Sequence, residues 1–81
     1  MSKEINNLST DELYILIGKN VARLRKEANM SQLDLSYAIG NKSPSLLSAA
    51  ELYKNKRKFN IAQLHKIAKI LDIDIVEFFE K

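Results

Sequence analysis

The segment LRKEANMSQLDLSYAIG, residues 24–40, decides the fold of this chain. Within it, Ser31 offers a hydroxyl that caps a helix, and Asp34 stands three residues on as the reciprocal partner. The apolar stripe of this helix consists of Leu35, Ala38 and Ile39. Gly40 then supplies the left-handed residue at which a helix stops and the chain turns. A short capped helix closed by glycine, lying between two further helices, predicts a helix-turn-helix.

Similar cap signals recur along the chain and predict five helices in all. The expected caps are Ser9 with Glu12, Ser31 with Asp34, Ser43 before Pro44, Asn60 with Gln63, and Asp74 with Glu77. Apolar residues follow these caps at helical spacing, and no alternating strand pattern is present. We therefore expect an all-α fold, a compact five-helix bundle. A single domain over residues 9–81 would follow a flexible segment over residues 1–8.

The register of the third helix depends on where that helix begins. Proline suits the first position of a helix and disfavours helical angles in the residue before it, which makes Ser43 the cap. Counting from Ser43 buries Leu47 and Ala50. An alternative register, in which all the extra residues of this region come before the helix, buries Leu46 and Ala49 instead.

Composition excludes several classes of protein. The 81 residues contain no cysteine and one histidine, His65, and no carboxylate cluster stands near that histidine at ligand spacing. There is no glycine-rich phosphate loop, so an enzyme, a bound metal, a cofactor or a small-molecule ligand is not expected. No apolar run approaches the ~18 residues of a membrane span, and no signal peptide is evident, which predicts a cytoplasmic protein without membrane contact.

Several short motifs, taken in order, resemble the lambda-repressor/Cro-like, or XRE, family of helix-turn-helix proteins. The motifs are IleGlyLysAsn at 17–20, LeuArgLysGlu at 24–27, MetSerGln at 30–32, Gly40, LeuHisLysIleAlaLysIleLeuAspIle at 64–73 and GluPhePhe at 77–79. The chain departs from the family at Ser36, where alanine is usual. The turn after Gly40 is one residue longer than usual, and the loop after the third helix is about two residues longer.

The resemblance implies that the third helix enters the major groove of double-stranded DNA. The candidates for base contacts are Pro44, Ser45, Leu46, Ser48 and Ala49. The candidates for phosphate contacts are Gln32, Lys42, Ser43, Lys54, Asn55, Lys56, Arg57 and Lys58. The resemblance also implies a structural ion pair between Arg25 and Glu51.

Two features of this region leave a second interpretation open. The third helix offers no arginine, asparagine or glutamine, which are the usual bidentate readers of guanine and adenine. Leu46 and Leu52 would then be exposed because they meet a protein partner. The basic run over residues 54–58 lies where it would follow the DNA backbone, although charge runs are also typical of solvated loops.

The end of the chain is densely apolar. Its candidates for a homodimer contact are Ile75, Val76, Phe78 and Phe79, because not all of them can face inward at once. The sequence thus favours a DNA-binding transcriptional regulator of the phage or bacterial repressor or controller type, acting as a homodimer. The alternative is an interaction module with the same fold, which docks a toxin or another repressor.

Overall fold

The computed structural model describes residues 3–81, and within that range every regular element is helical. The α-helices are α1 (Thr10–Glu27), α2 (Gln32–Ala38), α3 (Ser45–Glu51) and α4 (Ile61–Leu71). The 3-10 segments are η1 (Lys3–Asn7), η2 (Lys54–Lys56) and η3 (Ile75–Phe79). The all-α prediction is confirmed. The count of five helices is not confirmed, because the last expected helix is the 3-10 segment η3.

The predicted helix starts depend on side-chain caps, and four of them are present. Reciprocal capping boxes join Ser9 with Glu12, Ser31 with Asp34, Asn60 with Gln63, and Asp74 with Glu77. The cap predicted for α3 is wrong. Pro44 already has helical backbone angles, and the hydroxyl of Ser43 pairs with that of Ser45 at 2.9 Å rather than with a backbone amide. The last segment stays 3-10 because only five residues separate its cap from the extended Glu80, too few to build an α-helical ladder.

One hydrophobic core joins all the α-helices. Its fully buried members are Val21, Leu35, Leu47, Leu64, Ile67 and Phe78. Burial of Leu47 and Ala50, with Leu46 half exposed, confirms the register that was counted from Ser43. Ala38, expected in the apolar stripe of α2, is exposed, because α2 turns Leu35 and Ser36 inward and leaves Ala38 on its flank. The hydroxyl of Ser36 is buried without a hydrogen-bond partner among the described residues.

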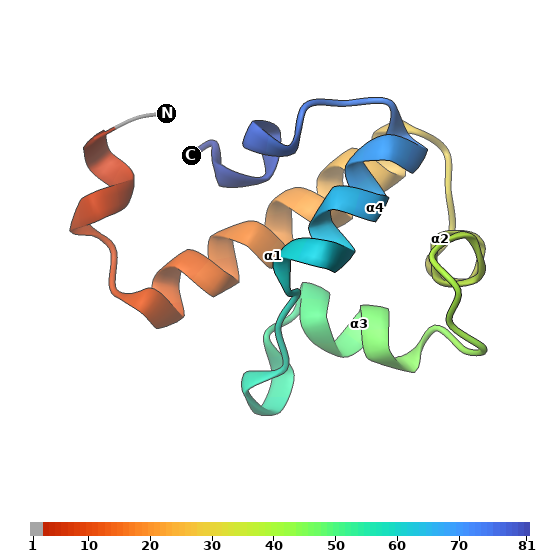
Figure 1. Ribbon diagram of the computed structural model, residues 1–81. Helices are drawn as coiled ribbons and strands as arrows, with labels where there is room; N and C mark the ends of the chain where they lie inside the picture. The colour runs from red at the N-terminus through yellow and green to blue at the C-terminus, as the bar shows by residue number, and fades with distance from the viewer. Residues whose placement is uncertain (1–2) are drawn as a thin grey trace.

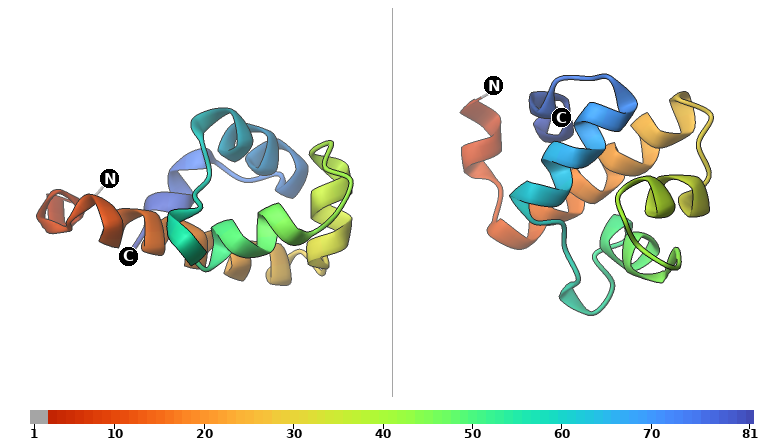
Figure 2. Two further views of the ribbon diagram at one scale, coloured as in Figure 1. Left: turned by 90° about the horizontal axis from the view of Figure 1, so that it is seen from below. Right: turned by 45° about the vertical axis from the view of Figure 1, so that its right-hand side comes forward.

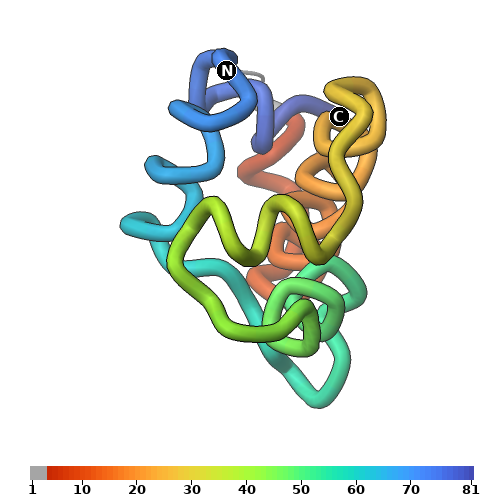
Figure 3. The backbone as a smooth tube through the Cα atoms, turned by 90° about the vertical axis from the view of Figure 1, so that its right-hand side faces the viewer, coloured from red at the N-terminus to blue at the C-terminus, as the bar shows by residue number. Residues whose placement is uncertain are grey.

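The arrangement of the helices leaves one loop standing away from the body. Figure 1 shows α1 running the length of the molecule, with α4 across it and α3 below. The connection from α3 to α4 projects beyond the helices in this view and in the right view of Figure 2. Figure 3 shows α2 and α3 on one side of the molecule, above the same loop. No helix in the described part of the chain is long and apolar enough to cross a bilayer.

The segment before α1 also has defined structure in its described part. Residues 3–7 form η1, and Ile5 is buried at 8% exposure. The carboxylate of Glu4 lies 3.9 Å from the ammonium of Lys81 at the other end of the chain. Residues 1–2 of the segment predicted to be flexible lie outside the described residues.

Candidate nucleic-acid interface

The turn between α2 and α3 has the geometry that its glycine predicts. Gly40 has a φ of +93°, in the region that favours glycine. Its amide donates to the carbonyl of Tyr37 at 3.0 Å, and the amide of Asn41 donates to the carbonyl of Ser36 at 2.8 Å. These bonds satisfy carbonyls at the end of α2 and fix the direction in which the chain leaves toward α3.

The outer side of α3 carries uncharged side chains, most of which are small. Ser45 and Leu46 are exposed, and the partly exposed residues beside them are Pro44, Ser48 and Ala49. All five candidates for base contacts therefore have surface outside the core, while Leu47 and Ala50 face inward. The hydroxyls and the leucine side chain suit contacts with base edges and thymine methyl groups, but none of them offers a bidentate pair.

A buried ion pair lies behind α3 and joins it to α1. The Nε of Arg25 donates to Oε2 of Glu51 at 2.8 Å, and Nη2 donates to Oε1 at 3.1 Å. Both side chains are at least nine-tenths buried, with 7% and 3% exposure. A third bond from Arg25 reaches the carbonyl of Met30 at 2.9 Å, just before α2. The expected pairing of Arg25 and Glu51 is present, and it links α1, the start of α2 and α3.

Gln32, a phosphate candidate, is tied into the same network. Its side-chain amide donates to Oε1 of Glu51 at 2.9 Å. An amide nitrogen carries two hydrogens, so one N–H remains for a second acceptor at the start of α2. Sequence reasoning did not foresee this bond, because nothing in the spacing of Gln32 and Glu51 indicates that they meet.

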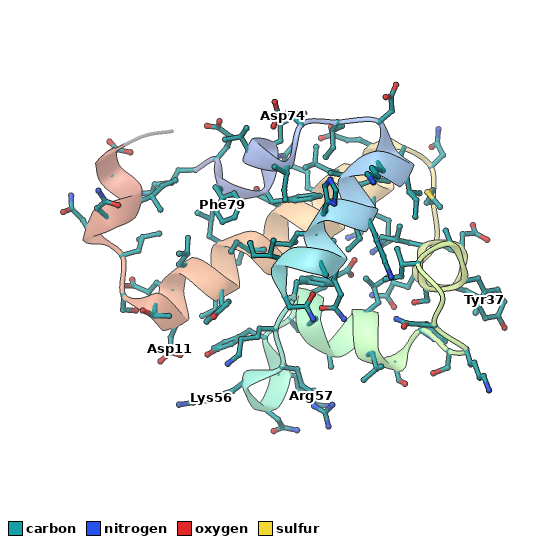
Figure 4. All side chains as sticks on the ribbon, viewed as in Figure 1. Asp11, Tyr37, Lys56, Arg57, Asp74 and Phe79 are labelled. Atoms are coloured by element: carbon teal, nitrogen blue, oxygen red, sulfur yellow. The ribbon has the colours of Figure 1, made fainter. Side chains whose placement is uncertain are left out.

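The loop after α3 carries five of the phosphate candidates, and all five are exposed. They are Lys54, Asn55, Lys56, Arg57 and Lys58. Figure 4 shows the side chains of Lys56 and Arg57 extending away from the helices at the tip of this loop. The exposed cations Lys42 and Arg57 thus lie on segments that come before and after α3.

A groove separates this loop from the outer side of α3. Its volume is about 250 Å³. Three base-contact candidates line it from α3, namely Ser45, Leu46 and Ala49. Three phosphate candidates line it from the loop, namely Lys54, Asn55 and Arg57. The fold therefore brings members of both predicted sets to one concave surface.

Lys58, the last basic residue of the loop, lies against α1 instead of the groove. Its ammonium lies 4.9 Å from the centre of the Tyr14 ring, within the range of a cation–π contact. The Tyr14 ring stacks on Tyr53, with centroids 5.7 Å apart and planes 20° from parallel. The hydroxyl of Tyr53 donates to Oδ1 of Asp11 at 2.5 Å. We call these four residues the tyrosine clasp.

The pKa of Tyr53 reflects this arrangement. The hydrogen bond to Asp11, with a smaller effect of burial, raises the pKa of the Tyr53 phenol to about 12. The hydrogen bond favours the protonated phenol, which is the donor to Asp11. Neither Tyr14 nor Asp11 was singled out from the sequence, because nothing in their spacing indicates that they meet Tyr53.

The apolar end of the chain divides into buried and accessible residues. Phe78 is fully buried in the core of the chain, so it has no surface to offer to a second copy. Ile75, Val76 and Phe79 are partly exposed on η3. The side-chain amide of Asn20 on α1 holds this segment, donating to the carbonyls of Phe78 at 2.8 Å and Glu80 at 2.7 Å.

A short capped helix, a glycine turn and a second helix beside a basic loop define a helix-turn-helix domain. The model of a protein family described as Helix-turn-helix matches residues 21–78, well over half of the chain. The chain belongs to this family, which is of the lambda-repressor/Cro-like (XRE) type and consists of DNA-binding domains. A search of curated proteins gives no match.

Proposed function

We propose that this protein is a transcriptional regulator, of the phage or bacterial repressor or controller type, that binds double-stranded DNA as a homodimer in the cytoplasm. Each subunit places α3 in the major groove, with half-sites about one helical turn apart. The observation that carries this proposal is the groove in which α3 and the basic loop face each other. Contacts to the phosphates fix the register and orientation in which a helix reads the bases.

The proposed contacts divide into two classes. Base contacts come from the outer side of α3, through Pro44, Ser45, Leu46, Ser48 and Ala49. Phosphate contacts come from Gln32, Lys42 and Ser43 on one side and from Lys54, Asn55, Lys56, Arg57 and Lys58 on the other. Since α3 has few groups that distinguish bases, most of the affinity comes from neutralised phosphates and falls steeply with salt.

The experiment that tests this function is a selection from random duplex DNA at near-physiological salt with the purified protein. Enrichment of an inverted repeat supports a dimeric, sequence-specific regulator and also identifies its operator. A pool that binds but stays random means that α3 does not read bases. A pool that is not retained at all, even at low salt, contradicts DNA binding.

The charge reversal Arg57→Glu is expected to weaken binding to every duplex sequence, on the order of tenfold at moderate salt. The reason is that Arg57 lines the groove from the loop and is replaced by a group that repels phosphate. The slope of log affinity against log salt should flatten by about one. The matched control is Lys69→Glu, which makes the same charge change on the exposed side of α4, in its last turn. Equal effects of the two variants would mean that net charge, not the groove, drives binding.

The substitution Phe79→Asp is expected to convert the proposed homodimer into a folded monomer. A charge placed on the partly exposed face of η3 opposes burial against a second copy. Sedimentation measures the mass, and circular dichroism checks the fold. Because Phe79 also packs against the core, Val76→Asp serves as a second variant, and Ile61→Asp on α4 is the control. An unchanged mass for both η3 variants would remove η3 from the dimer contact.

A second function is favoured by the exposed leucines. Leu46 is 50% exposed and Leu52 is 73% exposed, one on the outer side of α3 and one at its end. Apolar groups at a surface suit a protein partner better than a phosphate backbone. An interaction module of this kind would bind its partner with little dependence on salt, whereas DNA binding weakens steeply as salt is raised.

A further inference from the structure

The loop between α3 and α4 has an unusual backbone for its sequence. Three residues within four positions have positive φ, namely Tyr53 at 53°, Asn55 at 54° and Lys56 at 59°. This left-handed region favours glycine and is tolerated by asparagine, but it is uncommon for tyrosine and lysine. A backbone of this kind persists only where surrounding contacts hold it.

The tyrosine clasp supplies such contacts at both ends of the loop. Tyr53, the first left-handed residue, is fixed by its stack on Tyr14 and by its bond to Asp11. Lys58, at the other end of the loop, lies over the ring of Tyr14, which is the second member of the stack. The next residue, Phe59, is buried in the core at 5% exposure. Residues 54–57, which are all exposed, therefore form a short stretch with an anchor on each side.

The clasp joins the loop to a part of α1 far away in sequence. Asp11 and Tyr14 precede the residues that the family model matches, which begin at Val21. Tyr53 and Lys58, the two loop residues of the clasp, lie within the matched residues. The contact is thus a property of this chain that membership of the family does not itself imply.

We propose that the tyrosine clasp holds the basic loop in the conformation that meets DNA, and that Tyr53 is a positioning residue for that contact. This inference rests on the proposed function in one respect, the identity of the ligand. The benefit is preorganisation: an anchored loop loses less conformational freedom on binding than a free one. The cations presented in this way are Lys54, Lys56 and Arg57.

The test compares Tyr53→Phe with Tyr37→Phe. The first keeps the aromatic stack and every loop cation but removes the bond to Asp11. The second removes the same hydroxyl from a tyrosine that is 59% exposed on α2 and projects away from the body in Figure 4. Two quantities are measured for each variant: the order of the backbone amides of residues 54–57 by NMR relaxation, and affinity for duplex DNA across a salt series.

We expect Tyr53→Phe to make residues 54–57 more mobile and to weaken DNA binding on the order of threefold to tenfold. The salt slope should not change, because no cation has been removed. Tyr37→Phe should alter neither quantity. Asp11→Ala should reproduce the effects of Tyr53→Phe, and the double variant should be no worse than either single one, since all remove the same bond.

The outcomes separate this inference from the proposed function. An unchanged loop in Tyr53→Phe overturns the bond between Tyr53 and Asp11 as the anchor of the loop, whatever happens to DNA binding. A mobile loop with unchanged affinity overturns its role in positioning. If the unaltered protein does not bind DNA, the proposed function fails and the positioning role fails with it, while the NMR measurement still decides whether the clasp holds the loop.

Discussion

Replacing Glu51 with alanine is expected to lower the free energy of unfolding by about 3–5 kcal/mol. The carboxylate of Glu51 accepts two bonds from Arg25 and one from Gln32, and its side chain is only 3% exposed. Its removal leaves the guanidinium of Arg25 buried with one remaining partner among residues 3–81, the carbonyl of Met30. A domain of this size has a total stability of roughly 4–12 kcal/mol, so this loss is about a quarter of the total or more. Urea unfolding followed by circular dichroism measures the change.

Two further variants test whether burial of the ion pair causes this loss of stability. Arg23 and Glu27 form the exposed counterpart on α1, at 3.1 Å with side chains 50% and 61% exposed. Glu27→Ala should cost no more than about 0.5 kcal/mol, because water screens that pair. The double variant Arg25→Met with Glu51→Met should recover most of the stability that Glu51→Ala loses, since no unpaired charge remains. Similar losses for Glu51→Ala and Glu27→Ala would contradict a stabilising role for the buried pair.

Local signals in the sequence predicted most of the helical framework. Capping boxes form between residues three apart, so Ser9, Ser31 and Asn60 could be read without knowledge of the fold. The predicted cap of α3 is wrong because the hydroxyl of Ser43 has a second possible partner nearby. It bonds to the hydroxyl of Ser45 instead of to a backbone amide. The prediction of a fifth helix over the last segment is not confirmed, because a cap marks where a helix begins but does not set its length.

The candidate site depends on contacts that local patterns do not encode. Residues 54–58 were identified as a basic loop from composition, and their place beside α3 followed from the order of the helices. The clasp was not foreseen, because Tyr14 and Tyr53 belong to different elements and meet only after α1 and α3 have packed. The same holds for Asn20, whose amide reaches the carbonyl of Phe78 near the end of the chain. The identities of these residues were visible in the sequence, but their partners were not.

Replacing Gly18 with alanine is expected to destabilise the protein by at least about 2 kcal/mol. In most helices this change is favourable by about 1 kcal/mol, because alanine is the better helix former. Here a Cβ on Gly18 would lie 2.5 Å from the carbonyl oxygen of Glu51 and 2.8 Å from that of Ala50. These are backbone atoms, so α3 as a whole must move away from α1. That movement also disturbs Glu51 and its bonds to Arg25.

Thermal and urea unfolding measure the effect, and a loss of about 2 kcal/mol corresponds to a fall in Tm of roughly 10 °C for a domain of this size. Gly40 is the contrasting control, since a Cβ there meets nothing within 4 Å but φ is +93°. Gly40→Ala should therefore also destabilise, and Gly40→Asn should restore part of the loss, because asparagine tolerates left-handed angles. Gly18→Asn should restore nothing, because space and not backbone conformation limits Gly18. A Tm that rises in Gly18→Ala would mean that α1 and α3 lie farther apart than these distances require.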